Sequence, residues 1–262
     1  MSKPIKFVLE GQPGTLEPVH LDFVFHCEEA LSFLHWRSNF KGNMGHFVCS
    51  LENLDELYRY GESDADSTIP VGSLDFVEKY CMKFYGTSPL PIHIPPELMK
   101  PEYLLRRVWT NGDRPAGDDR ERYFVKESGK FKGLTDEVPL GKIRDGNDLF
   151  VSELMDIDSE WRGFVYRGRL ADVRRYCGRF NIFPSIPVME RMVHDYGNSP
   201  EAYTLDVAVL KSGDTAIVEV HPFFSCGLYG FEDYPLYIDM LRAGHRYMRG
   251  EKVWRHDEQR CR

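Results

Sequence analysis

The sequence has few cysteines, and their spacing excludes the common cysteine-based sites. They stand alone at positions 27, 49, 81, 177, 226 and 261, and no two of them form a Cys-x-x-Cys pair. Zinc ribbons and thioredoxin-like redox sites need such pairs and are therefore excluded. Isolated thiols fit a reducing cytoplasm better than a disulfide framework.

Long apolar runs and several familiar enzyme motifs are also missing. No run approaches the ~20 apolar residues of a membrane span, and the start of the chain lacks the apolar stretch of a signal peptide. The sequence has no His-Glu-x-x-His, Gly-x-Ser-x-Gly or Walker-type motif, which removes several common enzyme classes. We therefore expect a cytoplasmic protein with no membrane partner.

Positive charge is in deficit. The formal net charge of −8 argues against broad contact with a nucleic-acid backbone, which requires a basic surface. A local basic pocket stays open as an interpretation, because the segment Arg162–Arg179 is rich in arginine. The 262 residues, 42% of them hydrophobic and 28% charged, suit one large globular domain or two small ones.

The N-terminal part of the chain predicts a small α/β unit. Short apolar runs alternate there with helix-like stretches, and the runs are Ile5–Leu9, Leu21–Phe25 and His46–Leu51. Apolar spacing predicts a helix from Ser73 to Tyr85, with Ser73 as its N-cap and Gly86 as its stop. The proline-rich stretch Pro89–Pro96 cannot continue a helix or a central strand, so we interpret it as a connection between lobes.

After this connection the pattern becomes dominated by β-strands. The strand candidates are Arg122–Glu127, Leu149–Leu154, Arg162–Arg167 and Arg169–Arg174. The last two form a predicted hairpin around Gly168. Helices are expected at Met189–Tyr196 and Pro235–Met248. Strands followed by mixed helices on a partly antiparallel sheet indicate an α+β fold.

The most informative stretch is a predicted β-hairpin across residues 203–221. Two runs of β-branched and aliphatic residues flank a polar turn centred on Ser212-Gly213, which is the sequence signal for a hairpin. A two-residue turn pairs Lys211 with Asp214. Counting outward from that pair fixes which side chains share each face.

The polar face of this hairpin carries three candidate metal ligands. The register places Asp206 directly opposite Glu219, and His221 follows on the same face. Opposed carboxylates lie about 5 Å apart at Cβ and repel each other, which a divalent cation such as Mg or Mn would offset. An exposed hairpin whose acids each pair with a lysine or arginine explains the pattern equally well.

A second candidate site lies at the end of the strand that carries Lys126. The basic, glycine-containing loop 127–133 follows this lysine. Ammonium groups and free backbone N–H groups both favour an anion, so this arrangement suits nucleotide phosphates. A surface loop with solvated lysines is the alternative.

Two arginines stand in the predicted hairpin around Gly168. A lone Arg162 entering a strand beside Trp161 needs a partner or must extend to solvent, and Arg174 on the return strand faces the same choice. A two-residue turn places Arg174 opposite Trp161, whereas a three-residue loop places it opposite Arg162. The sequence does not decide this register.

The order of these motifs resembles the ATP-grasp superfamily. The shared positions are Lys126, Ser152-Glu-Leu, Glu160-Trp-Arg162, Asp172 to Tyr176, Asp206 and Glu219-Val-His221. The pattern is closest to a clade of ATP-grasp proteins common in phages and bacteria. In that clade a Gly-Ser-x-x-Phe helix precedes the domain, as Gly72–Phe76 does here, and a Gly-Leu-Tyr-Gly segment closes it, as Gly227–Gly230 does. The resemblance covers roughly residues 70 to 248.

The resemblance implies two α+β lobes with antiparallel sheets that hold ATP between them. A small α/β domain at residues 1–98 would precede a nucleotide-binding domain at residues 99–262. The roles it implies are phosphate contact for Lys126, Lys130 and Lys132, adenine and ribose contact for Glu153 and Leu154, γ-phosphate contact for Arg162 and Arg174, and Mg binding for Asp206 and Glu219. The superfamily usually has Asn in place of His221, and imidazole suits Mn better than Mg.

The resemblance further implies carboxylate activation. ATP would phosphorylate a small-molecule or peptide carboxylate, and an amine would displace phosphate from the acyl phosphate, leaving ADP. This chemistry needs charge neutralisation and positioning more than a protein nucleophile, so we interpret Cys226 as a buried structural cysteine. A small-molecule kinase and a non-catalytic nucleotide-binding module are the alternatives.

Overall fold

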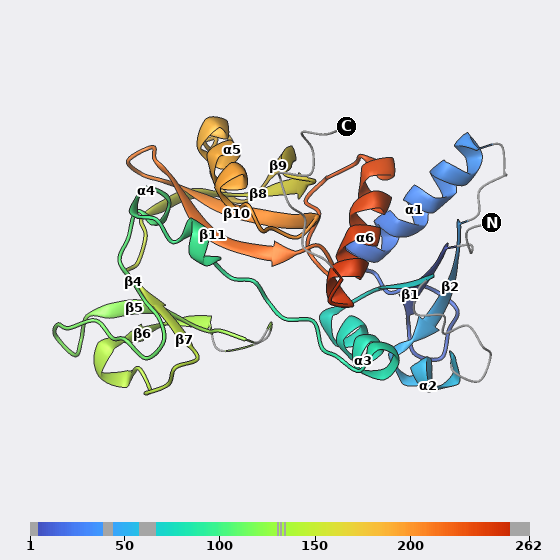
Figure 1. Ribbon diagram of the computed structural model, residues 1–262, viewed down its shortest axis with the longest axis horizontal. Coiled ribbons are helices and arrows are strands. Elements are labelled where there is room, and N and C mark those ends of the chain that lie inside the picture. The colour runs from blue at the N-terminus through green and yellow to red at the C-terminus, as the bar shows by residue number, and fades with distance from the viewer. Residues whose placement is uncertain are drawn as a thin grey trace. The chain divides into compact units, whose positions relative to one another are not determined.

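The computed structural model describes residues 5–38, 44–57, 67–129, 131, 133 and 135–251 (Figure 1). These residues form two compact units. Unit 1 holds the described residues up to Pro89, Pro200–Tyr203 and the described residues from Pro222 onward, whereas unit 2 holds Leu90–Ser199 and Thr204–His221. The domain boundary predicted between residues 98 and 99 stays a prediction. Within the described ranges, no helix has the length and apolar character needed to cross a membrane.

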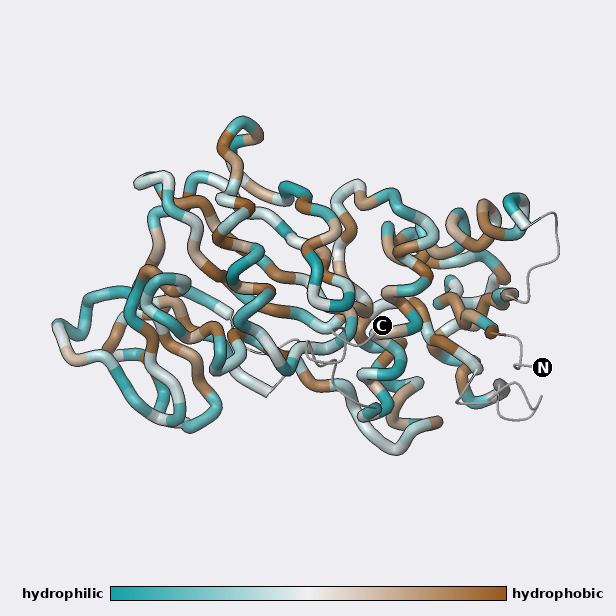
Figure 2. Tube along the Cα trace, turned by 45° about the horizontal axis from the view of Figure 1, so that its top comes forward, coloured by the Kyte–Doolittle hydropathy of each residue, from teal (hydrophilic) through white to brown (hydrophobic). Residues whose placement is uncertain are grey.

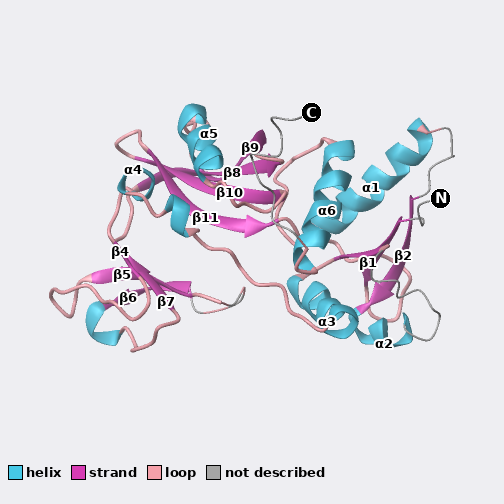
Figure 3. Ribbon diagram, viewed as in Figure 1, coloured by secondary structure: helices cyan, strands magenta, loops and turns pink. Residues whose placement is uncertain are grey.

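Unit 1 is a parallel three-stranded sheet with helices packed against it (Figure 3). The strand order is β2-β1-β3, with β1 at Ile5–Gly11, β2 at Met44–Ser50 and β3 at Thr68–Val71. The helices are α1 (Asp22–Arg37), the short α2 (Leu54–Leu57), α3 (Leu74–Tyr85) and α6 (Tyr234–Met248). A parallel sheet packed with helices is an α/β arrangement, as the sequence predicts for the N-terminal part.

The central strand of unit 1 is apolar along its length. Phe7, Val8 and Leu9 are fully buried, as a strand between two parallel neighbours under helices must be. The apolar runs Ile5–Leu9 and His46–Leu51 lie mainly in β1 and β2, whereas the run Leu21–Phe25 begins α1. Short apolar runs do not separate strand from helix by themselves.

Both ends of α3 follow the predicted capping chemistry. The Ser73 hydroxyl accepts a hydrogen bond from the Phe76 N–H at 3.3 Å, and Gly86 ends the helix in the left-handed region with φ of 69°. A glycine adopts this conformation without the steric cost that a Cβ brings. The helix predicted from Ser73 to Tyr85 is confirmed.

Helix α6 completes the core of unit 1. The Tyr237 hydroxyl donates to the Phe23 carbonyl in α1 at 2.6 Å, and the helix axis comes so close to the preceding segment that a Cβ at Gly244 would lie 2.1 Å from the Phe223 carbonyl oxygen. The predicted terminal helix at Pro235–Met248 is confirmed, since α6 spans Tyr234–Met248.

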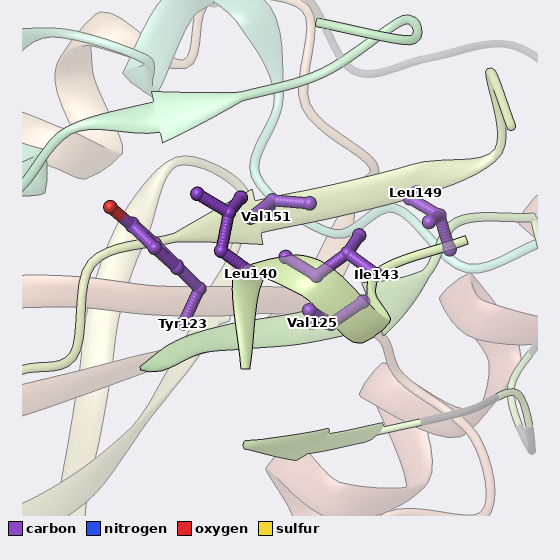
Figure 4. Packing of buried hydrophobic residues seen from close by; sticks show 6 residues of the cluster. All are labelled: Tyr123, Val125, Leu140, Ile143, Leu149 and Val151. Atoms are coloured by element: carbon purple, nitrogen blue, oxygen red, sulfur yellow. The ribbon is translucent and has the colours of Figure 1, made fainter. Parts of the chain in front are cut away.

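Unit 2 contains two four-stranded sheets. The smaller sheet has the order β4-β7-β5-β6 with antiparallel pairs throughout. Its strands are β4 (Val108–Trp109), β5 (Arg122–Glu127), β6 (Thr135–Pro139) and β7 (Leu149–Ser152). One face buries an apolar cluster shown in Figure 4, namely Tyr123, Val125, Leu140, Ile143, Leu149 and Val151. The strand predicted at Arg122–Glu127 is confirmed, and β7 is two residues shorter than the predicted Leu149–Leu154.

The larger sheet of unit 2 has the order β11-β10-β8-β9. Its strands are β8 (Ile157–Tyr166), β9 (Arg169–Gly178), β10 (Ala202–Leu210) and β11 (Thr215–Pro222). Helix α5 (Ile186–Asp195) packs against β9 and buries Met189, Met192 and Val193. The short helix α4 spans Pro101–Leu104. In Figure 2, hydrophobic residues recur along these strands, while the turns of unit 2 are mainly hydrophilic. The fold is α+β with antiparallel sheets, as predicted.

The β8–β9 hairpin resolves the register that the sequence left open. Its turn has two residues, Arg167 and Gly168, both with positive φ, as a type I′ turn requires. A register shift after Phe164 inserts one extra residue in β9. Because of this bulge, Arg174 lies opposite Arg162 even though the turn is short.

The turn between β10 and β11 differs from the prediction. The Leu210 N–H donates to the Asp214 carbonyl at 2.9 Å, and the Gly213 N–H donates to the Leu210 carbonyl at 2.8 Å. Leu210 therefore faces Asp214 across a three-residue turn, and the predicted pairing of Lys211 with Asp214 is wrong. Gly213 has φ of 92°, and a glycine at this position of a three-residue turn is typical of a bulged hairpin.

Candidate functional site

Arg162 and Asp206 form a buried ion pair on the larger sheet. The guanidinium donates from Nε to Oδ1 at 2.8 Å and from Nη2 to Oδ2 at 2.7 Å, which is bidentate geometry. Arg162 is 8% exposed and Asp206 is 2% exposed. Neither charge has access to bulk water, so each requires the other.

A second ion pair joins the two sheets of unit 2. The Lys126 ammonium group, on β5 of the smaller sheet, donates to Oε2 of Glu219, on β11 of the larger sheet. Both side chains are about a quarter exposed or less. The two acids of the predicted hairpin therefore each hold a cation, one from the same sheet and one from the other.

Strand β11 is irregular close to Glu219. In a regular strand, backbone groups an even number of residues apart point to the same neighbour. The Asp214 carbonyl points to β10, and the Ile217 carbonyl accepts from a side chain outside the sheet, as regular alternation requires. Val220 should point to β10 again, yet its N–H donates to the His93 carbonyl at 2.7 Å. The alternation therefore changes between Ile217 and Val220, and bulges of this kind are frequent beside functional sites.

This irregularity offsets the longer turn and leaves the carboxylates of Asp206 and Glu219 within electrostatic reach of each other. Burial raises the pKa of Asp206, and Arg162 partly opposes that rise while Glu219 adds to it. For Glu219, burial alone would raise the pKa, but Lys126, His221 and Arg162 together outweigh burial and lower it. The predicted meeting of the two acids is thus present through a route the sequence did not reveal.

A cavity of about 350 Å³ opens beside these ion pairs, entirely within unit 2. Its apolar wall is made of Ile94, Phe124, Phe150, Leu154, Met155, Ile157 and Val218. Its charged lining includes Arg106, Lys126, Glu153, Glu160 and Glu219. An apolar wall with a few convergent charged groups is the usual character of a small-molecule site.

Glu153 and Leu154 lie at the wall of this cavity, directly after β7. The Glu153 carboxylate accepts from the Arg107 backbone N–H at 2.8 Å and from its Nε at 2.7 Å. These bonds to Arg107 lower the pKa of Glu153. The Leu154 side chain is 44% exposed and therefore open to a ligand.

The remaining predicted residues differ in their placement. Arg174 pairs with Asp172 on its own strand at 2.8 Å and does not line the described part of the cavity. Lys130 and Lys132 lie outside the described residues. The structure thus brings together Lys126, Arg162, Asp206 and Glu219 and leaves Arg174 beside them.

Two polar residues of the site were not singled out from the sequence. Glu160 lines the cavity, and burial raises its pKa, while the Tyr176 hydroxyl donates to its Oε1 at 3.3 Å. The Arg162 guanidinium lies over the Tyr176 ring at 5.8 Å. Period-two alternation along β8 places Glu160 on the face of Arg162, and that signal was available in the sequence.

His93 and Arg106 also had no recognised sequence signal. Both line the cavity. Arg106 donates from Nη1 to the Ile217 carbonyl at 2.8 Å, and burial lowers its pKa to about 10. His93 lies in the proline-rich stretch interpreted as a connection between lobes, so that stretch contributes directly to the site.

His221 faces a small polar cavity of about 70 Å³ that it shares with His93, Lys126 and Glu219. Its ring lies 5.1 Å from the ring of Phe131. Across the described ranges, no group of three or more His, Cys, Asp or Glu side chains has converged as a metal site. The proposed ligand role of His221 therefore stays a prediction.

Comparison with known families gives one extended match. Residues 103–239, which are 137 of the 262 residues, match a family described as an ATP-grasp domain, the second family of its clade. A search of curated proteins finds no match.

Several solved structures resemble this chain at low identity. The ATP-grasp ligase PsnB complexed with minimal precursor has 13% identity and a TM-score of 0.46, with 91% of this chain and 99% of that chain covered. D-alanine–D-alanine ligase from Bacillus anthracis has 11% identity and a TM-score of 0.45, with 95% and 99% covered. N5-carboxyaminoimidazole synthetase from Staphylococcus aureus, complexed with ADP, has 10% identity and a TM-score of 0.47, with 95% and 77% covered.

Proposed function

The chain belongs to this clade family of ATP-grasp domains, and from this membership we propose that it is an ADP-forming ligase that joins a carboxylate to an amine. A carboxylate oxygen attacks the γ-phosphorus of ATP, the bond to the β–γ bridging oxygen breaks, and ADP leaves. The amine nitrogen then attacks the acyl carbon, phosphate departs, and the amine loses a proton. Such steps depend on alignment and charge neutralisation.

The observation that supports this proposal most directly is the cavity of about 350 Å³ with an apolar wall and Lys126 beside it. The apolar wall suits an adenine ring, and the segment at Glu153 and Leu154 offers backbone groups for its polar edge. Lys126 supplies a positive charge for the phosphates, in a partly buried setting where that charge acts more strongly than in water.

The arginines are assigned to the transferred phosphoryl group. Arg162 is fixed by Asp206, and Arg174 lies opposite it on β9. We assign both to the γ-phosphate and the acyl phosphate, where guanidinium groups bind oxygen atoms in pairs. Lys130 and Lys132 are assigned to the loop over the phosphates.

A divalent ion fits the donor set on the larger sheet. Asp206 and Glu219 present carboxylate oxygens within electrostatic reach of each other, and both already hold cationic side chains. Oxygen donors of this kind suit Mg, and an added imidazole from His221 suits Mn. When bound, the ion would neutralise phosphate charge.

Nucleotide binding provides the first test. Glu219→Gln and Lys126→Ala should each weaken Mg-ATP binding about tenfold or more, since each removes a charge from a partly buried phosphate site. Isothermal titration calorimetry measures this effect. Glu190→Gln and Lys142→Ala, at exposed positions away from the cavity, are the matched controls. Unchanged Mg-ATP affinity in both site variants would count against the site.

Product formation provides the second test. ADP release should require a carboxylate and an amine together in a screen of small-molecule and peptide substrates. Release with a single hydroxyl acceptor would identify a kinase instead. Tight ATP binding without ADP release across the screen would identify a nucleotide-binding module.

A further inference from the structure

His93 has an unusual backbone conformation that is fixed by β11. Its φ is 59°, a left-handed value that costs a non-glycine residue about 1 kcal/mol or more and that histidine tolerates better than most. The His93 carbonyl accepts from the Val220 N–H at 2.7 Å, and the two residues form an antiparallel bridge. The proline-rich segment is thereby attached to the outer edge of β11, next to Glu219.

The His93 side chain reaches the smaller sheet of the same unit. Its Nε2 accepts a hydrogen bond from the Gly129 N–H at 3.3 Å. Gly129 is the second residue after β5, the strand that carries Lys126. It has φ of 88°, so its N–H is oriented by a conformation that glycine adopts freely.

The surroundings of the imidazole suit a hydrogen-bond acceptor. Burial, with a further contribution from Lys126, lowers the pKa of His93 to about 4. A neutral imidazole has one unprotonated nitrogen, and only that form accepts from a backbone N–H. The ring also lines both the larger cavity and the small cavity that contains Lys126 and Glu219.

From these contacts we propose that His93 is a positioning residue that fixes Gly129, and with it the start of the loop after β5, beside the nucleotide phosphates. The inference rests on the proposed function for the identity of the ligand, whereas the contact between His93 and Gly129 belongs to the free protein. His93 links β11, which carries Glu219, to the strand end that carries Lys126. It therefore couples the two partners of the ion pair between the sheets.

The contact is testable without any nucleotide. Amide hydrogen exchange at Gly129, followed by NMR in the free protein, should be about fivefold faster in His93→Ala than in the wild type, the change expected for the loss of one hydrogen bond. His93→Gln keeps an acceptor of similar reach and should restore most of the protection. His194→Ala, at a largely exposed position on α5, is the control and should leave Gly129 unchanged.

Mg-ATP titrations of the same variants test the consequence for binding. His93→Ala should weaken binding about threefold to tenfold, and His93→Gln should recover most of it. Unchanged exchange at Gly129 in His93→Ala would overturn the inference, and so would a His93→Gln variant that behaves like His93→Ala. If the wild type binds no nucleotide while exchange responds as expected, the proposed function fails and the contact between His93 and Gly129 stands.

Discussion

The buried pair between Arg162 and Asp206 should dominate the stability of the larger sheet. Asp206→Asn leaves a guanidinium that is 8% exposed against a neutral amide, and removal of one partner from a buried ion pair costs about 3–5 kcal/mol. Arg162→Met leaves a carboxylate that is 2% exposed without its cation and should cost a similar amount. The double variant replaces both charges and should be destabilised by only about 1–2 kcal/mol, because no unpaired charge remains.

Urea unfolding of the four proteins, followed by circular dichroism, measures this cycle. The expected coupling energy exceeds about 2 kcal/mol, as is seen for residues in direct contact. A loss below about 1 kcal/mol in Asp206→Asn would refute the reasoning, since that is the size of an exposed ion pair. A double variant destabilised by the sum of the single losses would refute it as well.

Two further predictions concern single contacts. Gly244→Ala should lower the unfolding free energy by about 1–3 kcal/mol despite the better helix propensity of alanine, because the new Cβ would meet the Phe223 carbonyl oxygen at 2.1 Å; a thermal unfolding midpoint at or above that of the wild type would contradict this. Hydrogen bonds from Lys100 and Tyr103 lower the pKa of Asp195 to about 2. The stabilisation is therefore present above the ordinary carboxyl pKa of about 4 and is lost as the pH falls toward 2. The stability difference between wild type and Asp195→Asn, measured by urea unfolding, should shrink over that range, and a constant difference would exclude the effect.

Local chemistry explains which parts of the fold the sequence predicted well. The ends of α3 follow from Ser73 and Gly86, whose side chain or lack of one acts within a single turn. The bounds of β5 follow from alternation that the apolar cluster of the smaller sheet requires. In both cases the residues that decide the structure lie next to the structure they decide.

Register and long-range contacts were harder to predict, because distant residues decide them. The sequence left Arg174 opposite either Trp161 or Arg162, and a bulge with no glycine or proline signal decided it. The turn at Gly213 has three residues where two were predicted, and an irregularity in β11 compensates for the difference. His93 entered the site through tertiary contacts, which no spacing rule connects to Lys126.

Unit 1 is assembled from segments far apart in the sequence, and this affects how the protein can fold during synthesis. Helix α6 packs against α1, and the Leu228 N–H donates to the Asp22 carboxylate across 206 positions of the chain. On the ribosome, α1 and the sheet would emerge first and keep an apolar surface uncovered until α6 is made. Unit 2, whose sheets are nearly complete by His221, can form during that interval, so the N-terminal unit should be the last to become protected.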